Sequence, residues 1–102
     1  MNQLFKDPDL RRTWEGYLSH FYPHEYKPIG SKPLEWLHIH FIGQKGEVEI
    51  YLKDYRILIQ WGKVSEQEQN QIKKFVKENY KDIMAIIEKR LAKVGIKLVI
   101  PW

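Results

Sequence analysis

Apolar and polar residues alternate through the middle of the chain with the two-residue period of a half-buried strand. The alternation covers residues 34–62, and residues 43–46 and 53–54 interrupt it as two turns. Loops of four and two residues at these turns place the apolar positions of three strands on one face, which a shift of one residue would undo. The pattern therefore predicts an antiparallel meander. Its expected cross-strand pairs are Ile39 with Ile50, Phe41 with Val48, Ile50 with Ile57, Val48 with Ile59, and Leu52 with Tyr55.

Apolar spacings of three and four residues on either side of the meander predict helices. Residues 7–22 are expected to form an N-terminal helix, with Asp7 as its N-cap and Pro8 in its first turn. Pro23 ends this helix. Residues 23–33 contain three prolines and one glycine, so we expect them to form a loop.

A longer amphipathic helix is expected after the meander, over residues 65–94. Ser65 and Glu68 have the spacing of a capping box at its start. The helix is longer than a small domain needs, so a kink near Asn79 fits the pattern. Residues 96–101 are apolar and favour β structure, and we expect them to add an edge strand.

These elements predict an α+β fold, in which a three- to four-stranded antiparallel meander packs against the long C-terminal helix, with an additional N-terminal helix. The chain has 102 residues, so residues 1–102 are expected to form a single domain. It has no cysteine, which excludes disulfides, thiolate catalysis and cysteine-based metal centres. No cofactor is expected from the sequence.

The chain carries a net charge of +4, and the basic excess lies towards its C-terminal third. Lys73 and Lys77 belong to a row of lysines on the long helix, which is either a solvated face or a track for phosphates. The sequence has neither a signal-peptide pattern at its start nor an apolar run long enough to cross a bilayer. We therefore expect a cytoplasmic protein without membrane contact.

The same registers place an unusual set of polar and aromatic side chains on the face of the sheet opposite the apolar one. His40 is expected opposite Glu49, and in the third strand Trp61 is expected on the apolar side. The set comprises Trp36, His38, His40, Glu47, Glu49, Tyr51, Arg56 and Gln60. A solvated antiparallel face rarely carries two histidines beside two carboxylates, so this polar face is the candidate functional surface.

Three interpretations of the polar face remain open. The histidines can be structural, with satisfied ring nitrogens on a wet or covered face. Alternatively, His38 and His40 point the same way from one strand and form a metal site with Glu49 or Glu47. A second histidine pair, His20 and His24 near Glu25, is expected to be ordinary surface or loop residues and is not part of these sites.

The third interpretation is a nucleic-acid platform or a compact, metal-independent ribonuclease. His40 or Glu49 would then act as the base, because both can exchange protons near neutral pH. Arg56 would hold a phosphate, and Trp36 or Tyr51 would stack on a base.

The run His38-Ile39-His40-Phe41, followed by a Glu47-Val48-Glu49-Ile50-Tyr51-Leu52 strand and a capped helix, resembles a small bacterial family of domains of unknown function. The signature of that family is Pro-Pro-His-x-His-Val, then Glu-Ala-x-Phe and a long helix. The resemblance covers about residues 36–92, with His38, His40 and Glu47 on the recurring positions and Trp36-Leu37 in place of the two prolines. It implies membership of a toxin–antitoxin-like gene pair.

Together these observations favour a small binding module that contacts a protein or nucleic-acid partner through the polar face. An inhibitor protein without chemistry of its own is a further alternative, and exposed Trp36, Leu58, Trp61 and Trp102 would favour a protein partner. Pairing of the C-terminal strand with its symmetry mate would give a homodimer. Whether the N-terminal helix covers the polar face decides between these functions and a structural role.

Overall fold

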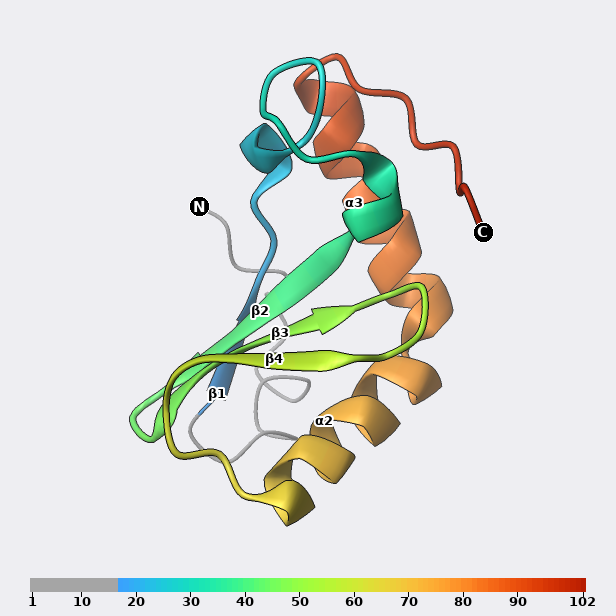
Figure 1. Cartoon of the computed structure of the whole chain (residues 1–102). Helices are drawn as coiled ribbons and strands as arrows, with labels where there is room; N and C mark the ends of the chain where they lie inside the picture. The colour runs from blue at the N-terminus through green and yellow to red at the C-terminus, as the bar shows by residue number, and fades with distance from the viewer. Residues whose placement is uncertain (1–16) are drawn as a thin grey trace.

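The structure is a computed structural model that describes residues 17–102. Within these residues four antiparallel strands form one sheet in the order β1-β2-β3-β4 (Figure 1). The strands are β1 (Tyr17–His20), β2 (His38–Gly43), β3 (Gly46–Tyr51) and β4 (Ile57–Gly62). The helices are α2 (Glu66–Glu78) and α3 (Tyr80–Lys93), with short 3-10 helices η1 (Pro23–Glu25) and η2 (Leu34–Trp36). The predicted α+β class is confirmed.

The register of the first hairpin is the predicted one. Ile39 pairs with Ile50, and Phe41 pairs with Val48. All four side chains are fully buried against the helices, where the ring of Phe41 contacts the ring of Phe75 edge-on. The apolar face of the sheet and the apolar faces of α2 and α3 therefore form the core, and the polar face of β2 and β3 points away from it.

The second hairpin keeps the predicted pairs Ile50–Ile57 and Val48–Ile59, but its last residues are shifted by a β-bulge between Glu47 and Val48. Beyond the bulge Glu47 pairs with Trp61. The expectation that Trp61 lies on the apolar side was therefore wrong, because the extra residue of a bulge changes the alternation from that point on.

The turn before β4 is longer than predicted, and the expected pairing of Leu52 with Tyr55 was wrong. Tyr55 has a φ of 61°, in the left-handed region, and its N–H donates to the carbonyl of Tyr51. The N–H of Leu52 donates instead to the carbonyl of Leu37. Burial of the Leu52 side chain in the core stabilises this wider turn.

The expected N-terminal helix over residues 7–22 is wrong at its C-terminal end, because Tyr17–His20 forms strand β1, and the rest of it lies outside the described residues. Alternate residues of β1 are buried, starting with Tyr17, and the strand pairs with β2 so that His20 lies opposite His40. Tyr17 and Phe21 are four residues apart, a spacing that fits both a helix and a strand. Hydrogen bonding to the edge of β2 stabilises residues 17–20 as a strand and not as a helix.

The long C-terminal helix is broken where a kink was predicted. Ser65 caps α2 by accepting the N–H of Glu68 at 3.1 Å, as the capping box predicts. At Asn79 the backbone leaves the helical region, with φ −110° and ψ 17°. The Asn79 side chain donates to the carbonyl of Phe75 at 2.9 Å, so the last turn of α2 is satisfied before α3 begins.

The expected C-terminal strand over residues 96–101 is not formed. The N–H of Ile96 bonds to the carbonyl of Leu91, which turns the chain at the end of α3, and Ile96 is buried in the core. Leu98 also packs against the core. Packing of these side chains therefore replaces strand pairing. Among the described helices, none has the length and apolar character needed to cross a membrane.

Candidate functional site

His38 and His40 lie on the polar face of β2, two residues apart and hence on the same side of the sheet. Their rings lie 4.9 Å apart between centroids. Both are buried, with 1% and 6% of their surface exposed, and so is Glu49 opposite His40 on β3. The centre of the polar face is therefore closed, and these three residues are not available for direct contact with a partner.

The loop between β1 and β2 brings a carboxylate to the two histidines. Glu25, the last residue of η1, places Oε2 at 3.0 Å from His38 Nε2 and Oε1 at 3.6 Å from His40 Nε2. Gly30 lies directly against the backbone of Glu25, where a Cβ atom would collide with it. The bend of this loop therefore sets where Glu25 stands.

The other ring nitrogen of His38, Nδ1, contacts two oxygen atoms close to it. Nδ1 lies 2.7 Å from the carbonyl oxygen of Trp36 and 3.0 Å from the hydroxyl of the buried Tyr26. The same hydroxyl accepts the backbone N–H of His38 at 3.0 Å. Because a carbonyl oxygen only accepts, we assign the ring proton of His38 to Nδ1.

His40 is held in the same way by Glu47. Its Nδ1 lies 3.0 Å from Glu47 Oε2, while Trp61 donates its indole N–H to Glu47 Oε1 at 3.3 Å. The ring of Tyr22 packs edge-on against His40. The β-bulge that moves Trp61 to this side thus helps to orient the carboxylate that positions His40.

The two Nε2 atoms are left facing Glu25. Both are buried, and neither has a hydrogen-bond partner with adequate geometry among residues 17–102. One ligand atom from each of Glu25, His38 and His40 lies within 4.8 Å of the others. Two buried imidazole nitrogens that converge on one carboxylate without well-formed hydrogen bonds to it have the arrangement of ligands around a cation.

The electrostatics of the site favour positive charge between these groups. Burial on its own raises the pKa of Glu25, but close contacts with His38 and His40 and their charges outweigh it and hold that pKa far below its usual range. Burial on its own lowers the pKa of His40, but its contacts with Glu25 and Glu47 and the charge of Glu49 raise it overall. The carboxylates therefore attract a proton or a cation to the imidazoles.

Glu49 or Glu47 was expected to supply the carboxylate of the two-histidine set, and the structure brings Glu25 to the Nε2 atoms instead. Glu49 Oε1 lies 3.9 Å from His38 Nε2 and 3.8 Å from His40 Nδ1. Its other oxygen accepts from the Tyr51 hydroxyl at 3.4 Å. Glu49 thus lines the site without joining the three converging groups.

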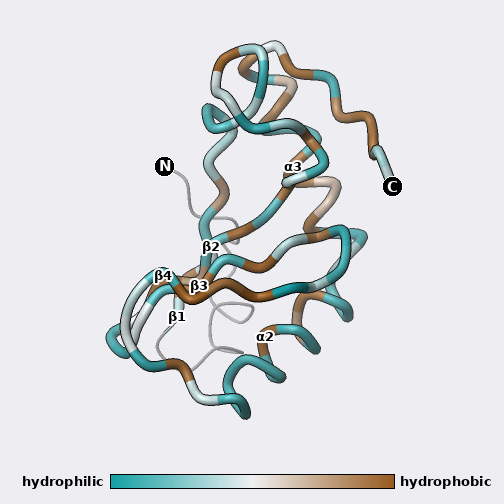
Figure 2. The backbone as a smooth tube through the Cα atoms, in the orientation of Figure 1, coloured by the Kyte–Doolittle hydropathy of each residue, from teal (hydrophilic) through white to brown (hydrophobic). Residues whose placement is uncertain are grey.

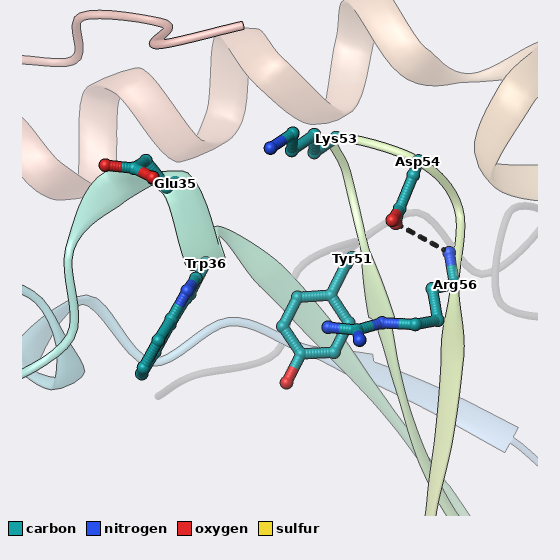
Figure 3. Close-up of a pocket in the computed structure, with 6 residues that line it drawn as sticks. All are labelled: Glu35, Trp36, Tyr51, Lys53, Asp54 and Arg56. Carbon is teal, nitrogen blue, oxygen red and sulfur yellow. Dashed lines mark hydrogen bonds between the residues drawn. The ribbon is translucent and has the colours of Figure 1, made fainter.

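Three of the predicted contact residues gather in a separate, open pocket of about 230 Å³ beside His38 (Figure 3). The guanidinium of Arg56 lies 4.7 Å above the ring of Tyr51, and Trp36 stands on the other side of the opening. The pocket is lined by Glu35, Trp36, Tyr51, Lys53, Asp54 and Arg56.

The remaining predicted contact residues lie elsewhere. Gln60 is exposed on β4, and Lys73 and Lys77 lie on α2, which packs against the opposite, apolar face of the sheet. Lys77 contacts the ring of Tyr55 at 5.1 Å. The structure therefore does not unite the basic row of the helix with the polar face.

The sequence did not point to Glu25 or Tyr26 as parts of this site. Their loop has no regular period, so spacing alone cannot place them over β2. One signal was available, because Tyr26 is a large aromatic residue in a loop composed mainly of prolines and polar residues. Its complete burial shows that the loop is anchored on the sheet.

Comparisons with known proteins identify no relative: no family model matches the chain, nor does any curated protein or any solved structure. The resemblance to the bacterial family of domains of unknown function stays a prediction that rests on the residues quoted for it.

Proposed function

We propose that this domain binds a divalent transition-metal ion, with Zn²⁺ as the ion that fits best, through His38, His40 and Glu25. The observation that carries the proposal is the convergence of two buried Nε2 atoms on one carboxylate, at 3.0 and 3.6 Å, without hydrogen bonds of good geometry. Two imidazoles and one carboxylate are a common donor set for zinc and other transition metals.

The surroundings of the histidines match those of metal ligands. A ligating histidine almost always donates its second ring N–H to a carbonyl or carboxylate, which fixes the ring and makes the ligating nitrogen more basic. His38 has the carbonyl of Trp36 in this position, and His40 has the carboxylate of Glu47. Bonds of about 2.0–2.2 Å to zinc bring ligand atoms to a little over 3 Å from one another, so the three groups need only small side-chain rotations.

Charge balance supports the same ion. Glu25, Glu47 and Glu49 place three carboxylates around two imidazoles, so the site is strongly negative when both histidines are neutral. A divalent cation supplies as much positive charge as two protons would. Three protein ligands leave a coordination position open, and a bound zinc ion would act there as a Lewis acid or lower the pKa of a water molecule.

Titration with Zn²⁺ tests the proposal directly. The full chain, freed of metals with a chelator and dialysed, is expected to bind one Zn²⁺ per chain at pH 7.5 in calorimetry, and to bind it at least about tenfold more weakly at pH 5.5 because protons compete for the imidazoles. His24→Ala, which removes an exposed histidine next to Glu25, should bind as the parent chain does. The proposal is contradicted if the parent chain does not bind one Zn²⁺ at pH 7.5, or if His24→Ala loses the binding that the parent chain shows.

A second candidate function is that of a small binding module in a toxin–antitoxin-like pair, with single-stranded nucleic acid as the partner. It is supported by the pocket around Trp36, Tyr51 and Arg56, which offers two aromatic rings and a guanidinium. The buried positions of His40 and Glu49 do not favour the ribonuclease alternative, because neither reaches the surface of the pocket.

The nucleic-acid candidate predicts that the chain binds a labelled single-stranded RNA in fluorescence anisotropy, and that Trp36→Ala weakens this binding about tenfold through loss of stacking. Trp102→Ala removes an exposed tryptophan elsewhere and serves as the matched control. If the RNA does not bind, or if both variants bind as the parent does, the pocket is not a nucleic-acid site.

A further inference from the structure

Strand β4 leaves one edge of the sheet open. It pairs with β3 on one side, and within residues 17–102 no strand lies on its other side (Figure 1). An open edge presents a row of main-chain N–H and C=O groups that can pair with another strand. Proteins usually protect such edges with lysine, proline or a very short strand.

β4 has none of these protections over its six residues. From Ile57 to Gly62 it contains no charged residue and no proline. Leu58, Ile59 and Trp61 are 49%, 42% and 49% exposed, and Figure 2 shows hydrophobic positions along this strand. The bulge lies at its far end, next to Glu47, and leaves the stretch from Ile57 to Ile59 regular.

Apolar side chains are exposed on both faces of β4. Leu58 pairs with Glu49 and so belongs to the polar face of the sheet, whereas Ile59 pairs with Val48 and belongs to the core face. A ligand resting on one face of the sheet would leave the other side chain in water. A strand added in the plane of the sheet would shelter both, so the edge fits strand addition.

We propose that β4 pairs with β4 of a second copy of this chain, antiparallel and centred on Leu58. In this register Leu58 lies opposite Leu58 of the second copy, and Ile57 lies opposite its Ile59. Directly opposed residues of antiparallel strands lie on the same face. Apolar residues thus meet apolar residues on both faces, and the core of each copy continues into the other.

A second copy satisfies the edge better than an unrelated strand does, because the sequence is complementary to itself in this register. Each chain carries a net charge of +4, but the segments from Ile57 to Ile59 that pair in this register carry no charge. The two-fold axis stands perpendicular to the sheet and keeps the helices of both copies on the same side. The result is a continuous sheet made of the four described strands of each chain.

The association state of the full chain tests the pairing. In analytical ultracentrifugation we expect twice the 12.4 kDa mass of one chain. Leu58→Lys should raise the dimer dissociation constant at least about a hundredfold, because it sets two ammonium groups opposite each other. In the single chain the new lysine faces Glu49, so the fold should be unharmed, which circular dichroism checks.

Val99→Lys is the matched control, since Val99 is an exposed apolar residue of the C-terminal tail, outside β4. It should leave the dimer intact. A monomeric parent chain, or a dimer that survives Leu58→Lys in a folded variant, overturns the proposal. A dimer lost in Val99→Lys but kept in Leu58→Lys assigns the interface to the tail instead.

The register is tested by cross-linking, because the chain has no cysteine of its own. Leu58→Cys should form a disulfide between copies when diamide takes up the two electrons and two protons of the thiols, since opposed Cα atoms lie about 4.5–5.5 Å apart. Ile59→Cys should not, because in this register the two residues 59 are diagonal neighbours at about 7–8 Å. Efficient cross-linking of Ile59→Cys alone excludes the Leu58-centred pairing.

Discussion

Replacing Glu25 with glutamine is expected to weaken Zn²⁺ binding by at least about a hundredfold while the chain remains folded. Loss of a group that only supports a ligand commonly costs 10–100-fold in metal affinity, so loss of a ligand should cost at least as much. The amide is neutral and a poor ligand for zinc. Glu25 is only partly buried and ends the short 3-10 helix η1, which is why the fold should tolerate the change.

Glu35→Gln is the control for this experiment, because Glu35 is an exposed carboxylate in η2 that lines the neighbouring pocket. Calorimetric titration at pH 7.5 should give the parent affinity for Glu35→Gln and a much weaker one for Glu25→Gln. Equal affinities of the two variants would mean that Glu25 is not a ligand. The two histidines would then have to bind with another carboxylate, and Glu49, at 3.9 Å from His38 Nε2, is the candidate.

Replacing Tyr26 with phenylalanine is expected to lower the free energy of unfolding by about 2 kcal/mol, because it leaves the buried N–H of His38 without an acceptor. The phenyl ring keeps its stacking on Phe21, so the loss comes from the hydroxyl alone. The same change frees His38 Nδ1 from one of its two contacts, and Zn²⁺ affinity should fall about tenfold.

Urea unfolding of the metal-free chain measures the first effect and calorimetry measures the second. Tyr22→Phe is the matched control, since the Tyr22 hydroxyl forms no hydrogen bond within residues 17–102 and its ring still packs on His40. A loss of stability as large in Tyr22→Phe as in Tyr26→Phe would contradict the role given to the Tyr26 hydroxyl.

The meander was predictable from the sequence because half-buried strands show an alternation of apolar and polar residues. The alternation around His38 and His40 established which side each residue faces, and the turn lengths established the pairs Ile39–Ile50 and Phe41–Val48. The helix and its break at Asn79 could also be predicted, because helix caps and apolar stripes are local.

The parts that were not predictable depend on contacts between distant segments. A spacing of four between Tyr17 and Phe21 fits a helix and a strand equally, and only the free edge of β2 decides. The bulge that brings Trp61 to Glu47 arises from how β4 closes on β3, which no periodic pattern records. Glu25 reaches the histidines through a loop whose path is set by tertiary packing, so the two histidines of the candidate site could be predicted from the sequence and its carboxylate could not.

The position of Glu25 has a consequence for a chain that contains no cysteine. Glu25 is the last residue of η1 in the connection between β1 and β2, and His38 is the first residue of β2, so the proposed metal ion would link two points thirteen positions apart in the sequence. The proposed ion would be held by the folded chain alone, so it would stabilise the folded state by an amount that grows with the free metal concentration. A chelator would remove this ion, so the stabilisation would be reversible, whereas the disulfides of other small domains stabilise them permanently.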